Sequence, residues 1–379
     1  MADSSIPSSE PAIATAPSDA SDVPSTLVVV LVPESETVDP SLAYYTDYSQ
    51  SRHELTQAFA VLGRPWRWTP VTVSSYAAVL DALVRDSTAR GEPLPTVLNL
   101  CDGDESNDVP GVAVIDALEA RGFQYTGANA AFYRGTTSKT PMKAAFRHAA
   151  VSTPPWHVWQ AGDDAEVVLA AVGIPAIVKP AVSAGSMGVT TDSVVHTADG
   201  LLTQLAALEA GYLGWNLLSG GVLVERFVAG REFTVLIVGS AASAESAHAF
   251  LPVERVFNAA LPHTEQFLSY DRLWEVYERE SALPGGAYLW EYAAITGKLA
   301  DDVMRLSWDA YVAVGGHGYG RIDIRQDKDS GALYVLEVNA QCALSEDENC
   351  TSVGAILRFA KTPYAALLAR ILAQTEARP

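Results

Sequence analysis

The chain has 379 residues, of which 49% are apolar and 18% are charged, a composition that suits a globular protein with several hydrophobic cores. Acidic residues outnumber basic ones 45 to 25, and the formal net charge of −20 argues against nucleic acid or an anionic membrane surface as a partner. The three cysteines form no CxxC pair, and no apolar run reaches the ~18 residues of a membrane helix. We therefore expect a cytoplasmic protein without a disulfide framework, a zinc site or a membrane partner.

The first part of the chain predicts a tail and an α/β domain. Residues 1–25 are rich in Ala, Ser and Pro and lack aromatic side chains, which is typical of a disordered segment. From residue 26 to 127, apolar strands alternate with helices, a pattern that indicates a mostly parallel sheet. The expected strands are "TLVVVLVP", "WRWTPVTV", "TVLNLCDG" and "FQYTG", and the expected helices lie near residues 50–62, 74–90 and 111–121.

Residues 128–228 predict a small α+β unit, with a helix that ends before the paired prolines of "STPPW". Its expected elements are helices near 138–150 and 198–211 and strands at "IPAIVKP", near 189–195 and at "GGVLVERFV". Residues 229–379 predict a third unit, which contains further strands, a long helix near 291–314, a hairpin and a closing helix near 363–374. Residues 260–290 show little periodicity, which favours a mobile loop or lid.

The hairpin "GRIDIRQDKDSGALYVLEVNAQ" places four polar side chains inside two apolar strands. Side chains two apart on a strand share a face, so Arg321 accompanies Asp323. By the same spacing, Glu337 accompanies Asn339. The turn "DKDSG" lies midway between the two acids, so antiparallel pairing places them opposite each other. Facing carboxylates repel unless a cation lies between them, and carboxylate and amide oxygens suit Mg²⁺. The alternative is a solvated sheet face on which the arginine balances the acids.

A lysine and a glycine-containing loop follow an apolar strand in "IPAIVKPAVSAGSMGV". Lys179 ends the strand, and Gly185, Ser186 and Gly188 lie in the loop. Glycines let backbone N–H groups approach an anion closely, and the lysine adds a compact charge, so the stretch could bind phosphate. It is not a Walker A loop. The alternative is a hairpin of small residues with one surface lysine.

Two glutamates flank the turn in "VLVERFVAGREFTVLIVG". Glu225 or Glu232 could hold ribose hydroxyls or an exocyclic amine, although an edge-strand charge explains either residue alone. Lys139, at a helix start in "GTTSKTPMK", could present a further cation to the same place, or it could simply be solvated.

Taken in order, these stretches resemble the ATP-grasp superfamily and, more narrowly, the D-alanine–D-alanine ligase family. The resemblance runs from about residue 94 to 345 and is most specific in "IVKPAVSAGSMGVT", "VLVERFVAGREFTV" and "GRIDI…LYVLEVN". It implies a three-domain ATP-grasp fold, with a parallel-sheet domain at 26–127, a small α+β subdomain at 128–228, and a C-terminal α+β subdomain with an antiparallel sheet at 229–379. It also implies that two sheets clasp ATP.

Carried over by position, the resemblance implies a nucleotide-binding set. Lys139 and Lys179 would hold the phosphates, and the loop 183–188 would close over them. Glu232 would bind the ribose. The adenine pocket would be lined by Glu225, Phe227 and Val228.

The resemblance also implies a catalytic floor. Two Mg²⁺ ions, with Mn²⁺ as the alternative metal, would be held by Asp323, Glu337 and Asn339. Arg321 would stabilise an acyl phosphate and the tetrahedral state that follows it, and Ser186 of the loop is the second catalytic candidate.

The substrate half departs from the family. Its N-terminal glycine-serine loop, with a glutamate that grips an amine, has no match in "VVVLVPESETVDPSLAYY", and its lid Lys-Tyr pair falls near Leu273 and Trp274. Where the family has a proline-glycine stretch and a serine for the acceptor's carboxylate, this chain reads "AQCALSEDENC". Acids there would repel a carboxylate and would instead favour a substrate with an amine or guanidinium group. The candidate substrate-binding residues are therefore Glu346, Asp347 and Glu348. Alternatively the acids face solvent, and Ser345 or Ser352 holds the acceptor.

We therefore expect an ADP-forming, carboxylate–amine ligase that makes an amide through an acyl phosphate. Its partners would be small-molecule carboxylate and amine substrates, either amino acids alone or an amino acid and a small carboxylic acid. A homodimer is one assembly that the chain could adopt. The alternatives are an ATP-grasp enzyme whose acyl phosphate meets another nucleophile, a nucleotide-binding, non-catalytic ATP-grasp protein, and a true D-alanine–D-alanine ligase.

Overall fold

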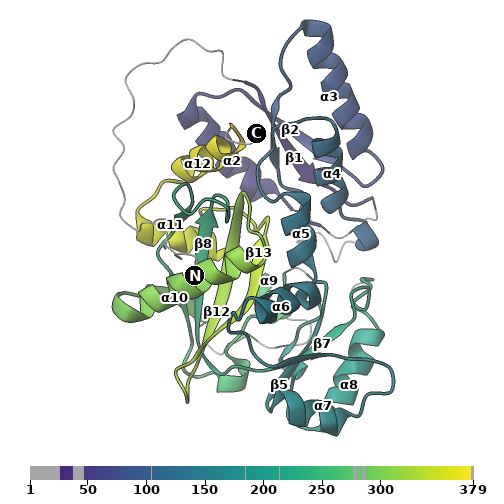
Figure 1. The fold of residues 1–379 in the computed structure, drawn as a ribbon, viewed down its shortest axis with the longest axis vertical. Coiled ribbons are helices and arrows are strands. Elements are labelled where there is room, and N and C mark those ends of the chain that lie inside the picture. The colour runs from purple at the N-terminus through teal and green to yellow at the C-terminus, as the bar shows by residue number, and fades with distance from the viewer. Residues whose placement is uncertain are drawn as a thin grey trace.

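The computed structural model describes residues 26–36, 47–103, 105–183, 185–212, 214–275, 280, 282–283 and 287–376. Three sheets follow one another along the long axis of the molecule (Figure 1). The tail expected at residues 1–25 lies outside the described residues. Within them, no helix is both long and apolar enough to cross a membrane.

The first sheet is parallel, as expected, with strand order β2-β1-β3. Its central strand is buried along its whole length, which explains its continuous apolar sequence. The predicted strand "FQYTG" is wrong: it contributes only a single parallel bridge from Tyr125 to Val97, because the chain turns away at Gly127. The elements of this unit are β1 (Val28–Pro33), α2 (Ser49–Leu62), β2 (Trp66–Val71), α3 (Tyr76–Arg90), β3 (Thr96–Asn99) and α4 (Val112–Ala120).

The second sheet is antiparallel, with strand order β4-β7-β5-β6. The strand expected near 189–195 shrinks to two residues, because Thr190 and Ser193 cap a 3₁₀ turn that occupies its middle. The elements here are α5 (Ala130–Thr137), α6 (Lys139–His148), β4 (Trp156–Val158), α7 (Ala165–Val172), β5 (Ala176–Pro180), β6 (Val194–Val195), α8 (Ala198–Glu209) and β7 (Val222–Arg226).

The third sheet is antiparallel, with order β11-β10-β8-β12-β13 and β9 beside β8. The long helix expected near 291–314 begins only at Gly297, because residues 290–294 pair with β10 as a strand. The elements are β8 (Gly230–Val238), β9 (His248–Ala249), β10 (Val253–Phe257), α9 (Tyr270–Trp274), β11 (Trp290–Ala294), α10 (Gly297–Ala313), β12 (Tyr319–Asp327), β13 (Leu333–Ala340), α11 (Ser352–Ala360) and α12 (Tyr364–Glu376).

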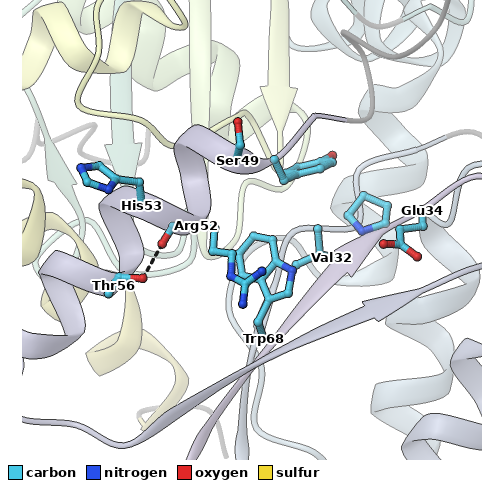
Figure 2. A pocket seen from close by; sticks show the side chains of 9 residues that line it. Val32, Glu34, Ser49, Arg52, His53, Thr56 and Trp68 are labelled. Atoms are coloured by element: carbon cyan, nitrogen blue, oxygen red, sulfur yellow. Dashed lines mark hydrogen bonds between the residues drawn. The ribbon is translucent and has the colours of Figure 1, made fainter. Parts of the chain in front are cut away.

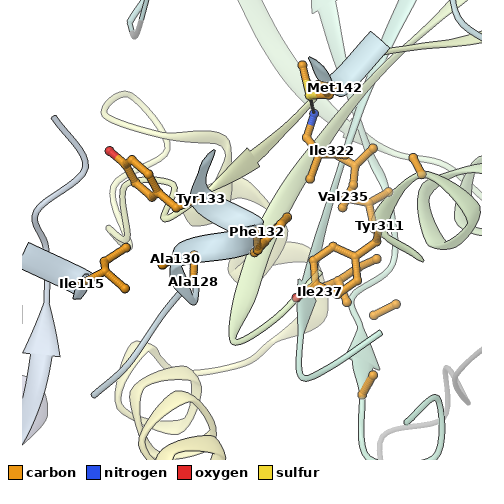
Figure 3. Close-up of a cluster of buried hydrophobic side chains, with 14 of the residues drawn as sticks. Ile115, Ala128, Ala130, Phe132, Tyr133, Met142, Val235, Ile237, Tyr311 and Ile322 are labelled. Atoms are coloured by element: carbon orange, nitrogen blue, oxygen red, sulfur yellow. Dashed lines mark hydrogen bonds between the residues drawn. The ribbon is translucent and has the colours of Figure 1, made fainter. Parts of the chain in front are cut away.

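One face of the third sheet is covered by α5, α6 and α10 (Figures 1 and 3). Phe132 of α5 meets Tyr311 of α10 edge to face, with ring centroids 5.4 Å apart, above the buried Ile322 of β12. Because alternate residues of a strand point to opposite faces, burying Ile322 and Ile324 turns Arg321 and Asp323 to the other face. The core therefore sets the direction of the polar side chains.

Gln341, directly after β13, joins the third sheet to the first. Its amide donates to the carbonyl of Asn99 on β3, and its Oε1 accepts from the N–H of Ala128 at 2.9 Å. The approach is so close that a Cβ at Gly127 would lie 1.8 Å from Gln341 Oε1. A buried side chain thus holds the ends of β3 and β13 together.

Gln341→Ala should lower the free energy of unfolding by about 2 kcal/mol, because it leaves a buried carbonyl and a buried N–H without partners. Urea denaturation followed by tryptophan fluorescence measures the change. Gln326→Ala is the matched control, since that exposed amide donates only to Gly331 in the hairpin turn. Equal urea midpoints for Gln341→Ala and the wild type would contradict the prediction.

Candidate active site

The hairpin brings its four polar side chains together as the sequence predicts. Asp323 pairs in register with Glu337, and Arg321 with Asn339. The guanidinium of Arg321 donates to Asp323, with Nη2 at 2.9 Å from Oδ2 and Nε at 3.1 Å from Oδ1. The Asn339 amide donates to the same carboxylate at 2.8 Å. The predicted cross-strand register is confirmed.

Asp323 is held as a carboxylate. Burial raises its pKa, but the charge and hydrogen bonds of Arg321 outweigh burial and hold this pKa below its usual range. Thr234 Oγ1 on the neighbouring strand β8 donates to Oδ1 at 2.9 Å. An ionised carboxylate facing a second carboxylate and an amide oxygen fits a hard divalent cation.

The described part of the chain contains no group of three or more His, Cys, Asp and Glu side chains that could hold a metal. A cation at this floor would therefore depend on two carboxylates, Asp323 and Glu337, and on the amide oxygen of Asn339.

Lys139 lies beside the floor at the start of α6. Its main-chain N–H donates to Ala181 O after β5, which places the helix start at the glycine-containing loop. Its ammonium is 3.2 Å from Ser183 Oγ and 3.9 Å from Glu337 Oε2. Burial lowers the pKa of this lysine, while the charge of Glu337 raises it. The structure thus brings Lys139 and Glu337 together from distant parts of the chain.

Lys179 and Glu225 are diagonal neighbours on the paired strands β5 and β7, with Lys179 Nζ 3.5 Å from Glu225 Oε1. The other oxygen of Glu225 is 3.0 Å from the ammonium of Lys143, which sequence reasoning missed. The available signal was its position one helical turn after Lys139. The Glu225 carboxylate therefore faces two lysines.

The loop 183–188, expected to bind phosphate, contacts the segment 260–290, expected to form a lid. Gly185 and Gly188 have positive φ, and a Cβ on Gly188 would meet Pro180 and Leu217 at 2.9 Å. Ser186 Oγ donates to Leu268 O at 3.0 Å, and Trp274 Nε1 donates to Gly185 O at 3.0 Å. The lid region 260–290 therefore contacts the loop at residues 268–274. Residues 276–279, 281 and 284–286 lie outside the described part.

Glu232 lies between two arginines on neighbouring strands. Arg255 of β10 donates to its Oε1, and Arg325 Nε of β12 is 3.3 Å from its Oε2. Arg325 also donates to the carbonyl of Val228 at 3.0 Å, and its guanidinium lies 5.2 Å from the ring centroid of Phe227. Arg325, which the sequence did not reveal, thus brings Phe227 and Val228 together with Glu232, whereas Glu225, the third residue expected at the base, faces the two lysines.

The acids after the floor are bonded within their own segment. Glu348 pairs with Arg358 at 2.6 Å, and the Asp347 carboxylate accepts from the N–H of Asn349 at 2.9 Å. Glu346 precedes them and is exposed. The carboxylates of Asp347 and Glu348 are therefore paired with Asn349 and with Arg358 of α11, and among the described residues neither bonds to the floor.

Of the two serines considered beside these acids, Ser352 lies nearer the floor. Ser345 donates to the buried Glu54 at 2.7 Å. Ser352, the buried first residue of α11, lies 3.4 Å from Thr234 Oγ1, which itself donates to Asp323.

Asp102 lies in the loop after β3, and no feature of the sequence singled it out. Burial raises its pKa to about 7. Its charge raises the pKa of the Cys342 thiol, which also responds to Arg321 and Asp323, so the carboxylate lies within electrostatic reach of the floor. Its carboxylate makes no hydrogen bond or ion pair with the side chain of another described residue.

An open pocket of about 420 Å³ lies elsewhere, at the end of β1 beside α2 (Figure 2). Arg52, His53 and Trp68 are among its lining residues, and none of the predicted site residues lines it.

Asp102→Asn should stabilise the protein more at pH 8 than at pH 5. A carboxyl whose pKa rises from 3.8 to about 7 on folding binds its proton more tightly in the folded state, so it lowers stability progressively as pH rises between those values. The amide removes this penalty, and we expect the gain to differ by at least about 1 kcal/mol between the two pH values. Denaturation at both pH values measures it, with the exposed Asp329→Asn as control. A pH-independent effect of Asp102→Asn would contradict the assigned pKa.

The family described as "D-ala D-ala ligase C-terminus" matches residues 147–347, more than half of the chain. D-alanine–D-alanine ligase B of Xanthomonas campestris pv. campestris is 28% identical over 306 residues, which cover 80% of this chain and 83% of the relative. The D-alanine–D-alanine ligase of Xanthomonas axonopodis pv. citri is 29% identical over 270 residues, covering 70% and 73%.

Solved structures agree on the fold. The match to the D-alanine–D-alanine ligase from Bacillus anthracis complexed with ATP has a TM-score of 0.60 at 16% identity. It covers 93% of this chain and 98% of the Bacillus chain. The enzyme from Coxiella burnetii has a TM-score of 0.60 at 14% identity, covering 92% and 95%. The resemblance seen in the sequence is confirmed: the chain belongs to the D-alanine–D-alanine ligase family and has the ATP-grasp fold of these ADP-forming carbon–nitrogen ligases.

Proposed function

We propose that the protein joins two amino acids into a dipeptide at the expense of ATP, and that D-alanine is the substrate to test first. The observation that carries the proposal is the polar floor of β12 and β13 in a chain of this family: Lys139 of α6 lies beside the floor, and Lys179 of β5 is within electrostatic reach of Lys139. The names of the relatives favour D-alanine over the changed acceptor expected from the sequence.

The nucleotide would lie between the second and third sheets. The division at residues 128–228 and 229–379 would then separate the two halves of the clasp, with 26–127 as the preceding domain. Lys139 and Lys179 would meet the phosphates beside the glycine-containing loop; Lys139 lies beside Glu337 and Lys179 beside Glu225. The base would lie toward Phe227 and Val228 and the ribose toward Glu232, whose orientation Arg255 and Arg325 fix.

Asp323, Glu337 and Asn339 would hold the divalent cation, with two Mg²⁺ ions as the proposed complement. A bound cation would neutralise phosphate charge and favour transfer of the terminal phosphoryl group to a substrate carboxylate. Arg321, fixed by Asp323, would hold the acyl phosphate oxygens and then the tetrahedral centre formed when the amine attacks. The segment 268–274, which covers the loop, would exclude water from the acyl phosphate.

The proposed amino-acid subsites are the part of the site that departs most from the family's sequence pattern. Ser352 would donate to the acceptor's carboxylate, a role supported by its contact with Thr234 at the floor. Asp102 would offer a carboxylate to a substrate ammonium group. A second candidate is a ligase with a different acceptor, which is favoured by Leu273 and Trp274, where family members carry a lysine and a tyrosine. A non-catalytic nucleotide binder would release no ADP.

Incubation with Mg-ATP and D-alanine alone should yield equimolar ADP and D-alanyl-D-alanine. Ser352→Ala should raise the KM for D-alanine by about tenfold, the effect of losing a hydrogen bond to a charged group. Neutralising Glu346, Asp347 and Glu348 together to their amides should change this KM less than about twofold, as is usual for surface substitutions away from a site. ADP release with other amino acids but not with D-alanine would overturn the D-alanine proposal in favour of the second candidate.

Glu337→Gln should lower turnover by at least about 100-fold at saturating Mg²⁺, because a neutral amide is a poorer cation ligand at the floor. The change is nearly isosteric, so the thermal midpoint should stay close to that of the wild type. Glu291→Gln, an exposed substitution on β11, is the control. Unchanged turnover in Glu337→Gln would remove the cation role.

A further inference from the structure

Lys143 is a completely buried ammonium group next to the proposed phosphate site. It lies one turn after Lys139 on α6, and its relative exposure is 0%. Lysine is rarely buried in this way unless its charge is paired and its N–H groups find acceptors. Its neighbours therefore show what the buried charge does.

Three acceptors from three parts of the chain surround this ammonium. Nζ donates to Thr153 Oγ1 at 2.6 Å and to Val335 O at 3.4 Å, and it lies 3.0 Å from Glu225 Oε2. Two of its N–H groups therefore donate to Thr153 and Val335, and Glu225 supplies the opposite charge at ion-pair distance. Burial lowers the pKa of Lys143 to about 8, and the charge of Glu225 acts against this shift.

Glu225 is 1% exposed and cannot rely on water for compensation of its charge. Its contact with Lys143 is 3.0 Å, whereas Lys179 remains at 3.5 Å from the other oxygen. Without Lys143, the buried carboxylate would have Lys179 as its nearest cation and would bind that lysine more strongly. The ammonium group next to the glycine-containing loop would then be committed to Glu225.

We propose that Lys143 is a positioning residue for ATP: it compensates Glu225 and thereby leaves the ammonium of Lys179 available to the phosphates. The proposal rests on the proposed function, because it takes Lys179 as a phosphate ligand. Lys143 and Thr153 also bind the carbonyl of Val335, two residues before Glu337, so the same contacts join α6 to the strand of the floor.

The test compares the affinities for ATP and for AMP, which lacks the two outer phosphates. Lys143→Met should weaken ATP binding by about tenfold and AMP binding by less than about threefold, equivalent to roughly 1.4 kcal/mol and under 0.7 kcal/mol. Isothermal titration calorimetry gives both constants, and a thermal melt reports folding. Lys298→Met, which removes an exposed lysine of α10, is the control.

Adding Glu225→Gln to Lys143→Met removes the uncompensated charge and should restore most of the lost ATP-to-AMP affinity ratio. Replacing both partners of a buried pair by neutral groups is also better tolerated than replacing one. If the role of Lys143 were purely structural, Lys143→Met would weaken the binding of ATP and AMP equally, and the double variant would not recover the affinity ratio. Either result would overturn the proposal.

Two further variants keep the test decisive. Thr153→Val removes one acceptor without a change of charge and should lower the same ratio by about two- to threefold, the effect of one hydrogen bond. If Lys143→Met does not fold, an unchanged ratio in Thr153→Val counts against the proposal. Lys179→Met tests the proposed function separately from this inference. An unchanged ATP-to-AMP affinity ratio in Lys179→Met contradicts the phosphate role of Lys179. A lowered ratio in Lys179→Met with no change in Lys143→Met contradicts this inference alone.

Discussion

The compensation of buried charge is the constraint on which the site depends. Asp323 and Glu337 face each other across β12 and β13, and each has a cation close by: Arg321 at 2.9 Å and Lys139 at 3.9 Å. On the second sheet the same arrangement recurs, with Glu225 between two lysines. Two of these pairs join separate elements: Lys139 connects α6 to Glu337 of the third sheet, and Lys143 connects α6 to Glu225 of the second. Because an unpaired buried charge is strongly destabilising, both pairs require α6 and the two sheets to pack together. Folding and assembly of the site are therefore one event.

The supporting elements show how this packing is secured. In the chain, α5 and α6 come between β3 of the first sheet and β4 of the second, yet they cover the apolar face of the third sheet (Figures 1 and 3). Gln341 then ties the end of the floor strand to β3 of the first sheet. The start of α6 lies at the glycine-containing loop, so one short helix carries both Lys139 and Lys143 to the junction. Each unit thus contributes a contact that holds the floor.

Much of this could be predicted from the sequence, for reasons that are local. A hairpin turn and the two-residue repeat of a strand suffice to place Asp323 opposite Glu337 and Arg321 opposite Asn339. The order of strands and helices likewise predicts the parallel first sheet. Residues 290–294 were mistaken for helix because only their pairing with β10 distinguishes them from the helix that follows.

The rest of the site depends on contacts between segments far apart in the chain. Nothing near Lys143 in sequence reveals that Glu225, 82 positions away, is its partner. Arg325 looks like an ordinary strand residue until β8 and β10 place Glu232 and Arg255 beside it. In the sequence Asp102 is an ordinary loop acid, and only the structure shows that burial raises its pKa to about 7. Such residues become visible only once the sheets are assembled.

The assembled charges also explain how an acidic protein could receive an anionic nucleotide. The chain as a whole carries −20, which would repel ATP from most of its surface. The site instead gathers lysines and arginines around its carboxylates, and the cations outnumber the acids there even with Asp102 included: Lys139, Lys143, Lys179, Arg255, Arg321 and Arg325 against Asp102, Glu225, Glu232, Asp323 and Glu337. At physiological ionic strength, exposed charges are screened over about 8 Å, whereas partly buried ones are screened much less. The interior of the clasp can therefore be attractive to phosphate although the exterior is not, and the wholly buried Lys143 contributes to that difference without ever having to touch the nucleotide.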